Sequence, residues 1–267
     1  MYDMHCHIVP KVDDGADSFE TSIKMIKIAK RNGFKGIFAT PHYVDNTTYN
    51  NTKLIKENFL KLKDKIKKEG LDIDIYIGNE VYVVPNLIKL FEKGFIYTLN
   101  NSRYMLIEFP MLDNPYFIES LIYDLKVKGI VPIIAHPERY KMITNNPNVL
   151  FKLIKQGALV QINLPSLKGS YGPIIKDTAK KLIEHNMIHF VGTDAHSFNI
   201  RTPNVEKPFK ILKSHLDNKK LKKILYENPK AVINDKEIKI WEPKECVKQS
   251  KINKFIRRYL TEKNKRN

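Results

Sequence analysis

The sequence predicts an α/β protein built as one barrel of parallel strands. Seven short apolar segments alternate with helical segments along the 267 residues. Such alternation is typical of parallel sheets, where each helix returns the chain to the start of the next strand. The units follow one another without an internal repeat or a low-complexity linker, which favours one barrel over two domains. Hydrophobic residues make up 42% of the chain and charged residues 28%, enough to bury a substantial core.

The predicted strands are short apolar runs that end near Gly, Pro or a polar residue. Runs of this length that are rich in Ile, Val, Phe and Tyr are typical of buried strands. Because side chains alternate along a strand, residues two apart leave the same face. The seven segments are residues 2–7, 36–40, 73–77, 104–107, 130–135, 158–162 and 188–191.

The predicted helices carry apolar residues three and four positions apart. In the first, Ile23, Ile26 and Ala29 form such a stripe between Ser18, a candidate N-cap, and Gly33, which ends the pattern. The helical patterns lie at residues 18–33, 54–70, 87–91, 115–128, 149–156, 173–186 and 209–225.

The chain is strongly basic, with 46 Lys and Arg against 29 Asp and Glu, a net charge of +17. This balance raises the expectation of an anionic partner such as nucleic acid, a phosphorylated substrate or an acidic membrane surface. The charge is concentrated at the C-terminus, where residues 244–267 hold nine Lys or Arg and two Asp or Glu, a net +7. We therefore divide the chain into a barrel domain, residues 1–243, and a basic C-terminal tail, residues 244–267.

The tail has the pattern of a basic amphipathic helix. Ile252, Phe255, Ile256, Tyr259 and Leu260 fall at helical spacing among Lys and Arg residues. Two interpretations stay open. The helix docks on its own barrel or on another subunit, or it binds an anionic membrane and makes the protein membrane-peripheral.

Cysteine usage and the apolar runs predict a cytoplasmic protein. Cys6 and Cys246 are far apart and form no disulfide framework, which favours a reducing compartment. No signal peptide is expected because His5 already lies in the first strand. The longest apolar runs, such as residues 130–135, are too short to span a bilayer.

Residues suited to metal binding gather where the predicted strands end. His5 and His7 leave the same face of the first strand. In barrels of parallel strands the reactive residues come from the carboxyl ends of the strands. Six of the seven strand ends carry a His, Asp or Glu, and the exception is Asn163. The candidate metal ligands are His5, His7, Asp14, His42, Glu80, Glu108, His136, Asp194 and His196.

The chemistry of this set predicts a cluster of two or three divalent ions. Five imidazoles and four carboxylates without a thiolate suit Mn, Fe, Zn or Mg. Three such ions carry more positive charge than the four carboxylates neutralise, so the filled site attracts an anion. Arg139 and Arg201 closely follow candidate ligands, and a guanidinium group matches phosphate oxygens well. We expect both arginines to contact a phosphate group.

Several motifs carry a resemblance to a known family. They are His5-x-His7, Val12-Asp13-Asp14-Gly15, Thr40-Pro41-His42, Glu80, Glu108, His136-Pro137-Glu138-Arg139 and Gly192-Thr193-Asp194-Ala195-His196. The set resembles the polymerase and histidinol phosphatase (PHP) superfamily. Residues 1 to about 240 are more closely similar to the bacterial manganese-dependent tyrosine-protein phosphatases of capsule and exopolysaccharide loci.

This resemblance implies a distorted, TIM-like (β/α)7 barrel of the PHP type with a trinuclear metal centre, Mn being the expected ion. It implies that the nine candidates are metal ligands and that Arg139 and Arg201 are the catalytic residues that bind the phosphate. It also implies a phosphotyrosine protein as substrate, a bacterial tyrosine kinase that controls capsule or exopolysaccharide synthesis. Where this chain has Cys6 the family often has Ser, and we interpret Cys6 as a small core residue.

The expected reaction is hydrolysis of a phosphomonoester by water that the metal cluster acidifies. The phenolate of tyrosine, with a pKa of about 10, is a comparatively good leaving group and reduces the need for a general acid. A cysteine-dependent mechanism is excluded, because it needs Arg six positions after its Cys, where this chain has Val12 and Ile252.

Two other functions stay open at this point. A histidinol-phosphate or other small-molecule phosphomonoesterase would share the fold and metal centre. A basic nucleic-acid-binding protein would explain the net charge, but the sequence has no aromatic-basic stripe or recognised binding module, which disfavours it. The sequence leaves the native metal and the oligomeric state open.

Overall fold

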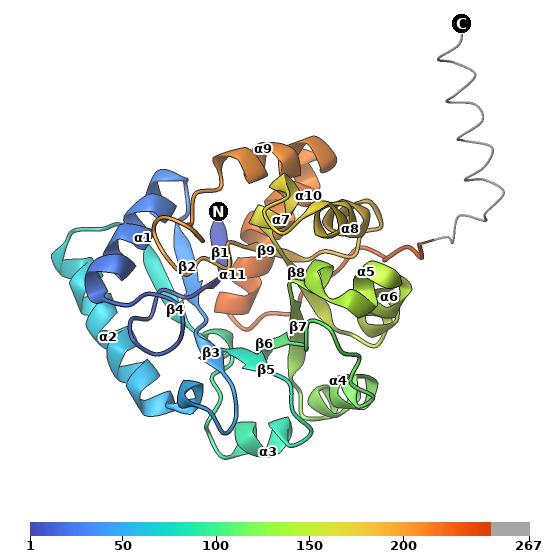
Figure 1. The fold of residues 1–267 in the computed structure, drawn as a ribbon, viewed down its shortest axis with the longest axis horizontal. Coiled ribbons are helices and arrows are strands. Elements are labelled where there is room, and N and C mark those ends of the chain that lie inside the picture. The colour runs from blue at the N-terminus through green and yellow to red at the C-terminus, as the bar shows by residue number, and fades with distance from the viewer. Residues whose placement is uncertain (247–267) are drawn as a thin grey trace, which may run out of the picture.

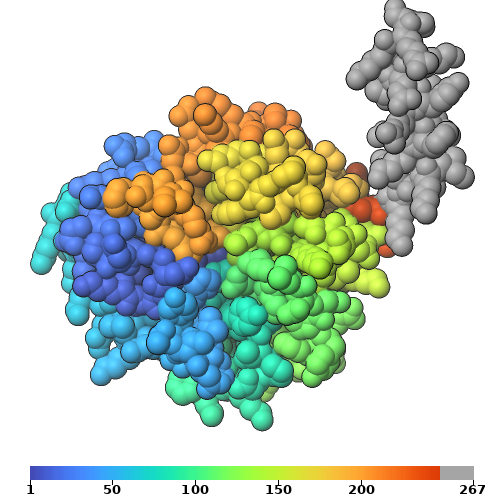
Figure 2. All heavy atoms as spheres, in the orientation of Figure 1, coloured from blue at the N-terminus to red at the C-terminus, as the bar shows by residue number. Residues whose placement is uncertain are grey.

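The computed structural model describes residues 1–246 as a ring of parallel strands with most helices outside it (Figure 1). In the space-filling view, segments coloured from blue through green to orange surround the centre of the molecule in chain order (Figure 2). One sheet has the order β1-β2-β4, from Tyr2–Cys6, Gly36–Ala39 and Asp74–Ile77. The other has the order β3-β5-β6-β7-β8-β9, from His42–Tyr43, Glu80–Tyr82, Tyr104–Glu108, Val131–Ala135, Leu159–Asn163 and Phe190–Gly192.

One junction between the two sheets lies at the ends of β1 and β9. Cys6 pairs with Ala195 in an isolated parallel bridge. The N–H of His7 donates to the carbonyl of Ala195 at 2.9 Å, and the N–H of Asp194 donates to the carbonyl of His5 at 2.8 Å. These bonds join the first and last strands of the barrel and bring both of their carboxyl ends to one place.

The second junction comes from two strands that are interrupted and then resume. β3 continues β2, and β5 continues β4, each after two residues. The N–H of Gly78 donates to the carbonyl of Ala39 at 3.0 Å, and the N–H of Glu80 donates to the carbonyl of Pro41 at 3.1 Å. The pairing therefore runs across both interruptions, so the nine short strands make seven barrel strands. The predicted distorted (β/α)7 barrel is confirmed.

The first six predicted helices are present in the predicted order, but the helix predicted at residues 209–225 is divided into three segments. The Ser18 N-cap is confirmed, because its hydroxyl oxygen accepts from the N–H of Thr21 at 3.1 Å. The α-helices are α1 (Phe19–Arg31), α2 (Thr52–Lys68), α3 (Leu87–Glu92), α4 (Ile118–Val127), α5 (Lys141–Asn145), α6 (Asn148–Lys155), α7 (Leu164–Lys168), α8 (Pro173–Glu184), α9 (Glu206–His215), α10 (Asn218–Lys222) and α11 (Asn228–Ile233). The shorter helical segments are η1 (Thr48–Asn50), η2 (Leu99–Asn101), η3 (Pro137–Arg139) and the π-helical η4 (Lys223–Glu227).

Two hydrophobic clusters hold the barrel together. The larger one lies between the strands and the surrounding helices and includes Cys6, which is fully buried as expected. The smaller one includes Leu106, Leu159 and Phe190, each two residues before a polar or glycine position on the same strand face. It fills the barrel interior below the strand ends, and Val232 of α11 belongs to it. The polar side chains thus lie above an apolar floor.

The chain leaves the barrel beside α6. The N–H of Lys244 donates to the carbonyl of His185 at 2.8 Å, and Asn148 exchanges two hydrogen bonds with the backbone of Cys246. The predicted helix of the basic tail, with Ile252 to Leu260, lies outside the described residues. Within residues 1–246, no helix is long and apolar enough to cross a membrane.

Candidate metal centre

The nine predicted ligands lie together at the carboxyl ends of the barrel strands. Seven of them form three groups in which one ligand atom of each residue lies within 4.8 Å of the others. The groups are His7, Asp14, His42 and His196; His5, His7 and Glu80; and His42, Glu80 and Glu108. Because each pair of groups shares one of His7, His42 and Glu80, the three groups are adjoining parts of one cluster.

The remaining two predicted ligands contact this cluster directly. His136 Nε2 lies 2.7 Å from Glu80 Oε1 and 3.7 Å from Glu108 Oε1. Asp194 Oδ1 lies 3.5 Å from His7 Nε2 and 3.7 Å from His5 Nε2. The structure therefore brings all nine side chains together, and eight of the nine residues are buried or nearly so.

Unpartnered buried atoms indicate that the cluster is built to hold cations. His42 Nδ1, Glu80 Oε2, His136 Nδ1 and His196 Nε2 have no hydrogen-bond partner within residues 1–246. Leaving buried polar atoms unpaired is costly unless another group, such as a metal ion, satisfies them. His5 Nε2 and His7 Nε2 also lie only 3.0 Å apart. Nitrogen and carboxylate donors in this arrangement fit a cluster of divalent ions.

The pKa shifts of four of the predicted ligands are consistent with a cation site. Burial, followed by the neighbouring Glu80 carboxylate, raises the pKa of Glu108 to about 9. Burial opposes ionisation of Glu80, but His5, His42 and His136 lower its pKa well below the usual range. Burial lowers the pKa of His136 and of His196 to about 4, which keeps these imidazoles neutral, the form that binds a metal. A cation between Glu80 and Glu108 would relieve their mutual repulsion.

Two of the predicted ligands have strained backbones. His136 has φ +30° and Asp194 has φ +50°, in the left-handed region that non-glycine residues rarely adopt. Both residues come directly after or near the end of a strand, β7 and β9. Strain of this kind clusters at functional sites, where surrounding contacts hold the side chain in its working position.

Asp13 holds the imidazole of one predicted ligand and the backbone of another from outside the cluster. Its Oδ2 accepts from His7 Nδ1 at 2.7 Å and from the N–H of His42 at 2.9 Å. Its Oδ1 accepts from the N–H of Gly15 at 3.0 Å. A Cβ at Gly15 would lie 2.4 Å from the carbonyl oxygen of His7, so only glycine allows this loop to close on the first strand. The His7 ring is held with Nε2 facing the cluster.

The sequence prediction missed four buried polar residues around the cluster. Asp3 accepts from the N–H and the hydroxyl of Thr193 at 2.8 and 2.6 Å. The other three are Asp13, Glu138 and Gln161, all fully or almost fully buried at the side chain. Asp13 and Glu138 stand inside the quoted motifs, which was the one available signal.

The two predicted phosphate ligands, Arg139 and Arg201, lie at the outer edge of the cluster. Arg139 Nη1 donates to Asp194 Oδ2 at 2.9 Å, and Arg201 Nη2 donates to Asp194 Oδ1 at 2.7 Å. Their side chains are 22% and 34% exposed, whereas that of Asp194 is 1% exposed. The Arg139 guanidinium also lies 4.9 Å from the ring centroid of Tyr171. Asp194 therefore holds both guanidinium groups between the cluster and solvent.

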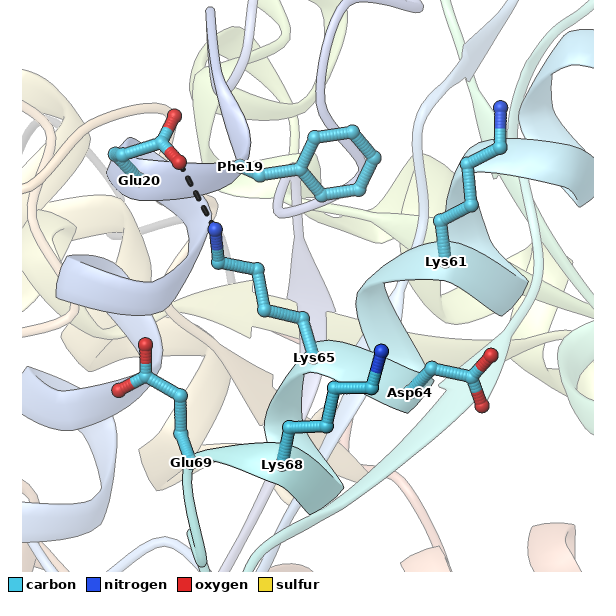
Figure 3. Close-up of a pocket in the computed structure, with 7 residues that line it drawn as sticks. All are labelled: Phe19, Glu20, Lys61, Asp64, Lys65, Lys68 and Glu69. Atoms are coloured by element: carbon cyan, nitrogen blue, oxygen red, sulfur yellow. Dashed lines mark hydrogen bonds and ion pairs between the residues drawn. The ribbon is translucent and has the colours of Figure 1, made fainter.

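A separate surface hollow of about 750 Å³ lies between α1 and α2 (Figure 3). Lys65 crosses it to form an ion pair with Glu20 at 2.9 Å. Its lining residues are Phe19, Glu20, Lys61, Asp64, Lys65, Lys68 and Glu69. None of these is a cluster residue, and their mixed charges show no preference for an anion or a cation.

Comparison with known proteins identifies the family and agrees with the fold. A family model for capsular polysaccharide synthesis, CpsB/CapC, matches residues 1–234. The tyrosine-protein phosphatase YwqE of Bacillus subtilis is 35% identical over 256 residues, which cover 96% of this chain and 100% of that protein. The putative tyrosine-protein phosphatase CapC of Staphylococcus aureus is 37% identical over 257 residues, covering 94% and 98%.

Solved structures give the same result. A crystal structure reported for YwqE from Bacillus subtilis and CpsB from Streptococcus pneumoniae, described as unique metal-dependent tyrosine phosphatases, matches with a TM-score of 0.87 and 34% identity, covering 93% of this chain and 100% of that one. An amidohydrolase from Mycoplasma synoviae matches with a TM-score of 0.57 at 14% identity, covering 98% and 94%, which shows a shared fold alone. The resemblance seen in the motifs is confirmed, and the chain belongs to the CpsB/CapC family of capsular polysaccharide synthesis.

Proposed function

We propose that the nine clustered side chains hold the metal ions with which this chain hydrolyses phosphotyrosine in proteins. The chain is a metal-dependent tyrosine-protein phosphatase of the CpsB/CapC family, which acts in capsular polysaccharide synthesis. The observation that carries the site assignment is the sharing of His7, His42 and Glu80 among three adjoining ligand groups. Shared ligands are what a multinuclear centre needs, because one residue then faces two ions.

The proposed cofactor is two or three divalent ions, with Mn as the first choice and Fe, Zn or Mg as alternatives. The donor set supports ions of this class, because it combines imidazole nitrogens with carboxylate oxygens and lacks a thiolate. When bound, the ions acidify water and draw charge from the phosphoryl oxygens. The chain's own part is to place the ligands, which it does through strand ends and the strained turns at His136 and Asp194.

Arg139 and Arg201 are the proposed phosphate-binding residues. Each uses one Nη to contact Asp194, which leaves further N–H groups of each guanidinium for oxygens of the substrate. The Nε of Arg201 is buried and has no partner within residues 1–246. Because the tyrosine phenolate leaves readily, with a pKa of about 10, no residue needs to act as a strong general acid.

The proposed protein substrate is a bacterial tyrosine kinase of the capsule pathway, as the motif resemblance implies. Membership of the CpsB/CapC family supports a substrate in that pathway. We further propose that the basic tail, residues 244–267, brings the enzyme to an anionic membrane surface. Deletion of the tail should abolish pelleting with anionic vesicles while leaving turnover of a soluble peptide unchanged, and unchanged pelleting would refute the membrane proposal.

The experiment that tests the function compares substrates with and without metal. Purified protein is stripped with a chelator, restored with Mn, and assayed on a phosphotyrosine peptide, the matching phosphoserine peptide and histidinol phosphate. We expect Mn-dependent preference for phosphotyrosine, lost in His136→Ala and retained in His215→Ala, a histidine on α9 outside the cluster. Preference for histidinol phosphate would refute the assignment of phosphotyrosine as substrate. Full activity of His136→Ala would refute the assignment of the metal site.

A further inference from the structure

Strand β8 contributes no proposed metal ligand, although it lies between β7 and β9 in the barrel (Figure 1). Its last inward-facing residues, Gln161 and Asn163, are both fully buried amides. They connect two proposed ligands, which lie at the two ends of one hydrogen-bond chain. His5 Nδ1 lies 3.0 Å from Gln161 Oε1, Gln161 Nε2 lies 2.9 Å from Asn163 Oδ1, and Asn163 Nδ2 lies 2.8 Å from Asp194 Oδ2.

The direction of this hydrogen-bond chain follows from its Asp194 end. An ionised carboxylate only accepts, so the NH2 group of Asn163 must be the donor to Asp194. The carbonyl oxygen of Asn163 therefore faces Gln161 and accepts from its NH2 group. The carbonyl oxygen of Gln161 then faces His5, and an oxygen with no hydrogen can only accept. His5 must carry a proton on Nδ1.

The other nitrogen of His5 faces the cluster. His5 Nε2 lies 3.1 Å from Glu80 Oε2 and 3.0 Å from His7 Nε2. A neutral imidazole with its proton on Nδ1 has its lone pair on Nε2, where a metal ion needs it. The hydrogen-bond chain thus selects the one neutral tautomer in which His5 can act as a ligand, and it holds the rotamer of Asp194 with the same set of bonds.

We propose that Gln161 and Asn163 are positioning residues of the metal centre, which fix His5 in its Nδ1–H tautomer and Asp194 in its working orientation. The proposal rests on the proposed roles of His5 and Asp194 as metal ligands. Neither amide side chain is itself a titratable group. The amides also add no charge to a site that already holds four carboxylates.

The surroundings are shaped to keep the two amides in place. A Cβ on Gly192 would lie 2.6 Å from His5 Cβ and 2.8 Å from Gln161 Nε2, so the glycine in β9 provides the space that this contact needs. The backbone of Asn163 is held independently, because its N–H donates to Glu138 Oε1 at 2.8 Å. The same carboxylate oxygen accepts from the hydroxyl of Ser166 at 2.7 Å.

The test measures metal affinity and stability as separate quantities. Gln161→Met and Asn163→Ala each break the chain, and Asn228→Ala is the matched control. Asn228 is also a buried amide, but it donates to the carbonyl of His189. For each full-length protein, the Kd for Mn is obtained by competition with a chelator, metal content by elemental analysis, and the melting temperature by calorimetry on the metal-free form.

We expect Gln161→Met and Asn163→Ala to weaken Mn binding about tenfold to a hundredfold, the range found for residues that orient metal ligands. Asn228→Ala should lower the melting temperature and leave the Kd unchanged. Because both substitutions break one chain, the double variant should weaken binding by less than the product of the single effects.

Several results would overturn the proposal. If wild-type protein binds Mn and either single variant binds it within about twofold of wild type, the amides do not position ligands. Fully multiplicative effects in the double variant would show that the two residues act separately. If the wild-type protein itself does not bind Mn, the assignment of the metal ligands is wrong as well. If wild type binds Mn and the variants bind it equally well, only the positioning role is wrong. If Gln161→Met does not fold, the Kd of Asn163→Ala for Mn still decides whether the amides position the ligands.

Discussion

His7 Nδ1 lies 2.7 Å from Asp13 Oδ2 in an almost fully buried pair at the edge of the metal cluster. The same carboxylate oxygen accepts from the backbone N–H of His42 at 2.9 Å. One side chain therefore sets the ring of one proposed ligand and the backbone of another. His7 and His42 belong to the same four-residue ligand group, so Asp13 controls the geometry of that group without entering it.

Asp13→Asn should weaken Mn binding about tenfold to a hundredfold, because an amide orients His7 less strongly than a carboxylate and raises its basicity less. The Kd is measured by chelator competition. Asp17→Asn is the control, since Asp17 follows in the same loop and bonds to Thr21 instead of a proposed ligand. Equal affinities of Asp13→Asn and wild type would show that His7 needs no such support.

Arg139→Lys and Arg201→Lys should each lower kcat/KM for a phosphotyrosine peptide about tenfold to a hundredfold. That range corresponds to the loss of one charge-assisted hydrogen bond of about 1.5–3 kcal/mol, since Lys lacks the planar fork of Arg. Steady-state kinetics provide the measurement. Arg103→Lys is the control, because Arg103 pairs with Asp235 on the surface away from the cluster. Unchanged kcat/KM in both site variants would show that the two arginines do not bind the phosphate group.

His189 should make the fold less stable as the pH falls. Burial, with a smaller contribution from Lys223, lowers its pKa from 6.5 to about 3, and its Nδ1 accepts from the N–H of Val160 at 3.0 Å. The unfolded chain takes up a proton near pH 6.5 and the folded chain does not. The contribution of His189 to the free energy of unfolding is therefore fully present well above pH 6.5. It is lost progressively as the pH falls, by about 2 kcal/mol between pH 7 and pH 5.

The measurement compares urea unfolding of wild type and His189→Asn at several pH values. The Asn side-chain oxygen can replace Nδ1 as the acceptor, but it does not titrate. We expect the difference in unfolding free energy between the two proteins to shrink as the pH drops below 6.5. A difference that stays constant with pH would show that His189 is not held neutral in the folded protein.

The positions of the strands and the candidate ligands were predictable from the sequence because both depend on local patterns. Apolar runs ended at His, Asp or Glu, and parallel strands place such ends together. The interruptions at residues 40–41 and 78–79 were not predicted, since they depend on contacts between distant segments. Glycine is needed at position 78 because a Cβ there would lie 2.5 Å from the Leu99 side chain. No local sequence pattern reveals this contact.

The residues that orient the ligands were hidden for the same reason. Gln161 contacts His5 across 156 positions of sequence, and Asp3 contacts Thr193 across 190. Either residue has an ordinary place in a strand pattern. Asn163 was noted only as the strand end that lacked a ligand, and the structure places it in the hydrogen-bond chain that reaches Asp194.

The number of Mn ions bound per chain tests the central claim most directly. Metal-stripped protein is loaded with Mn, freed of excess metal, and analysed for metal and protein content, beside Glu80→Gln. We predict two or three ions per wild-type chain and fewer in Glu80→Gln, because Glu80 belongs to two of the three ligand groups. A wild-type chain that binds one ion or none, or a Glu80→Gln variant with the full number, would contradict the account.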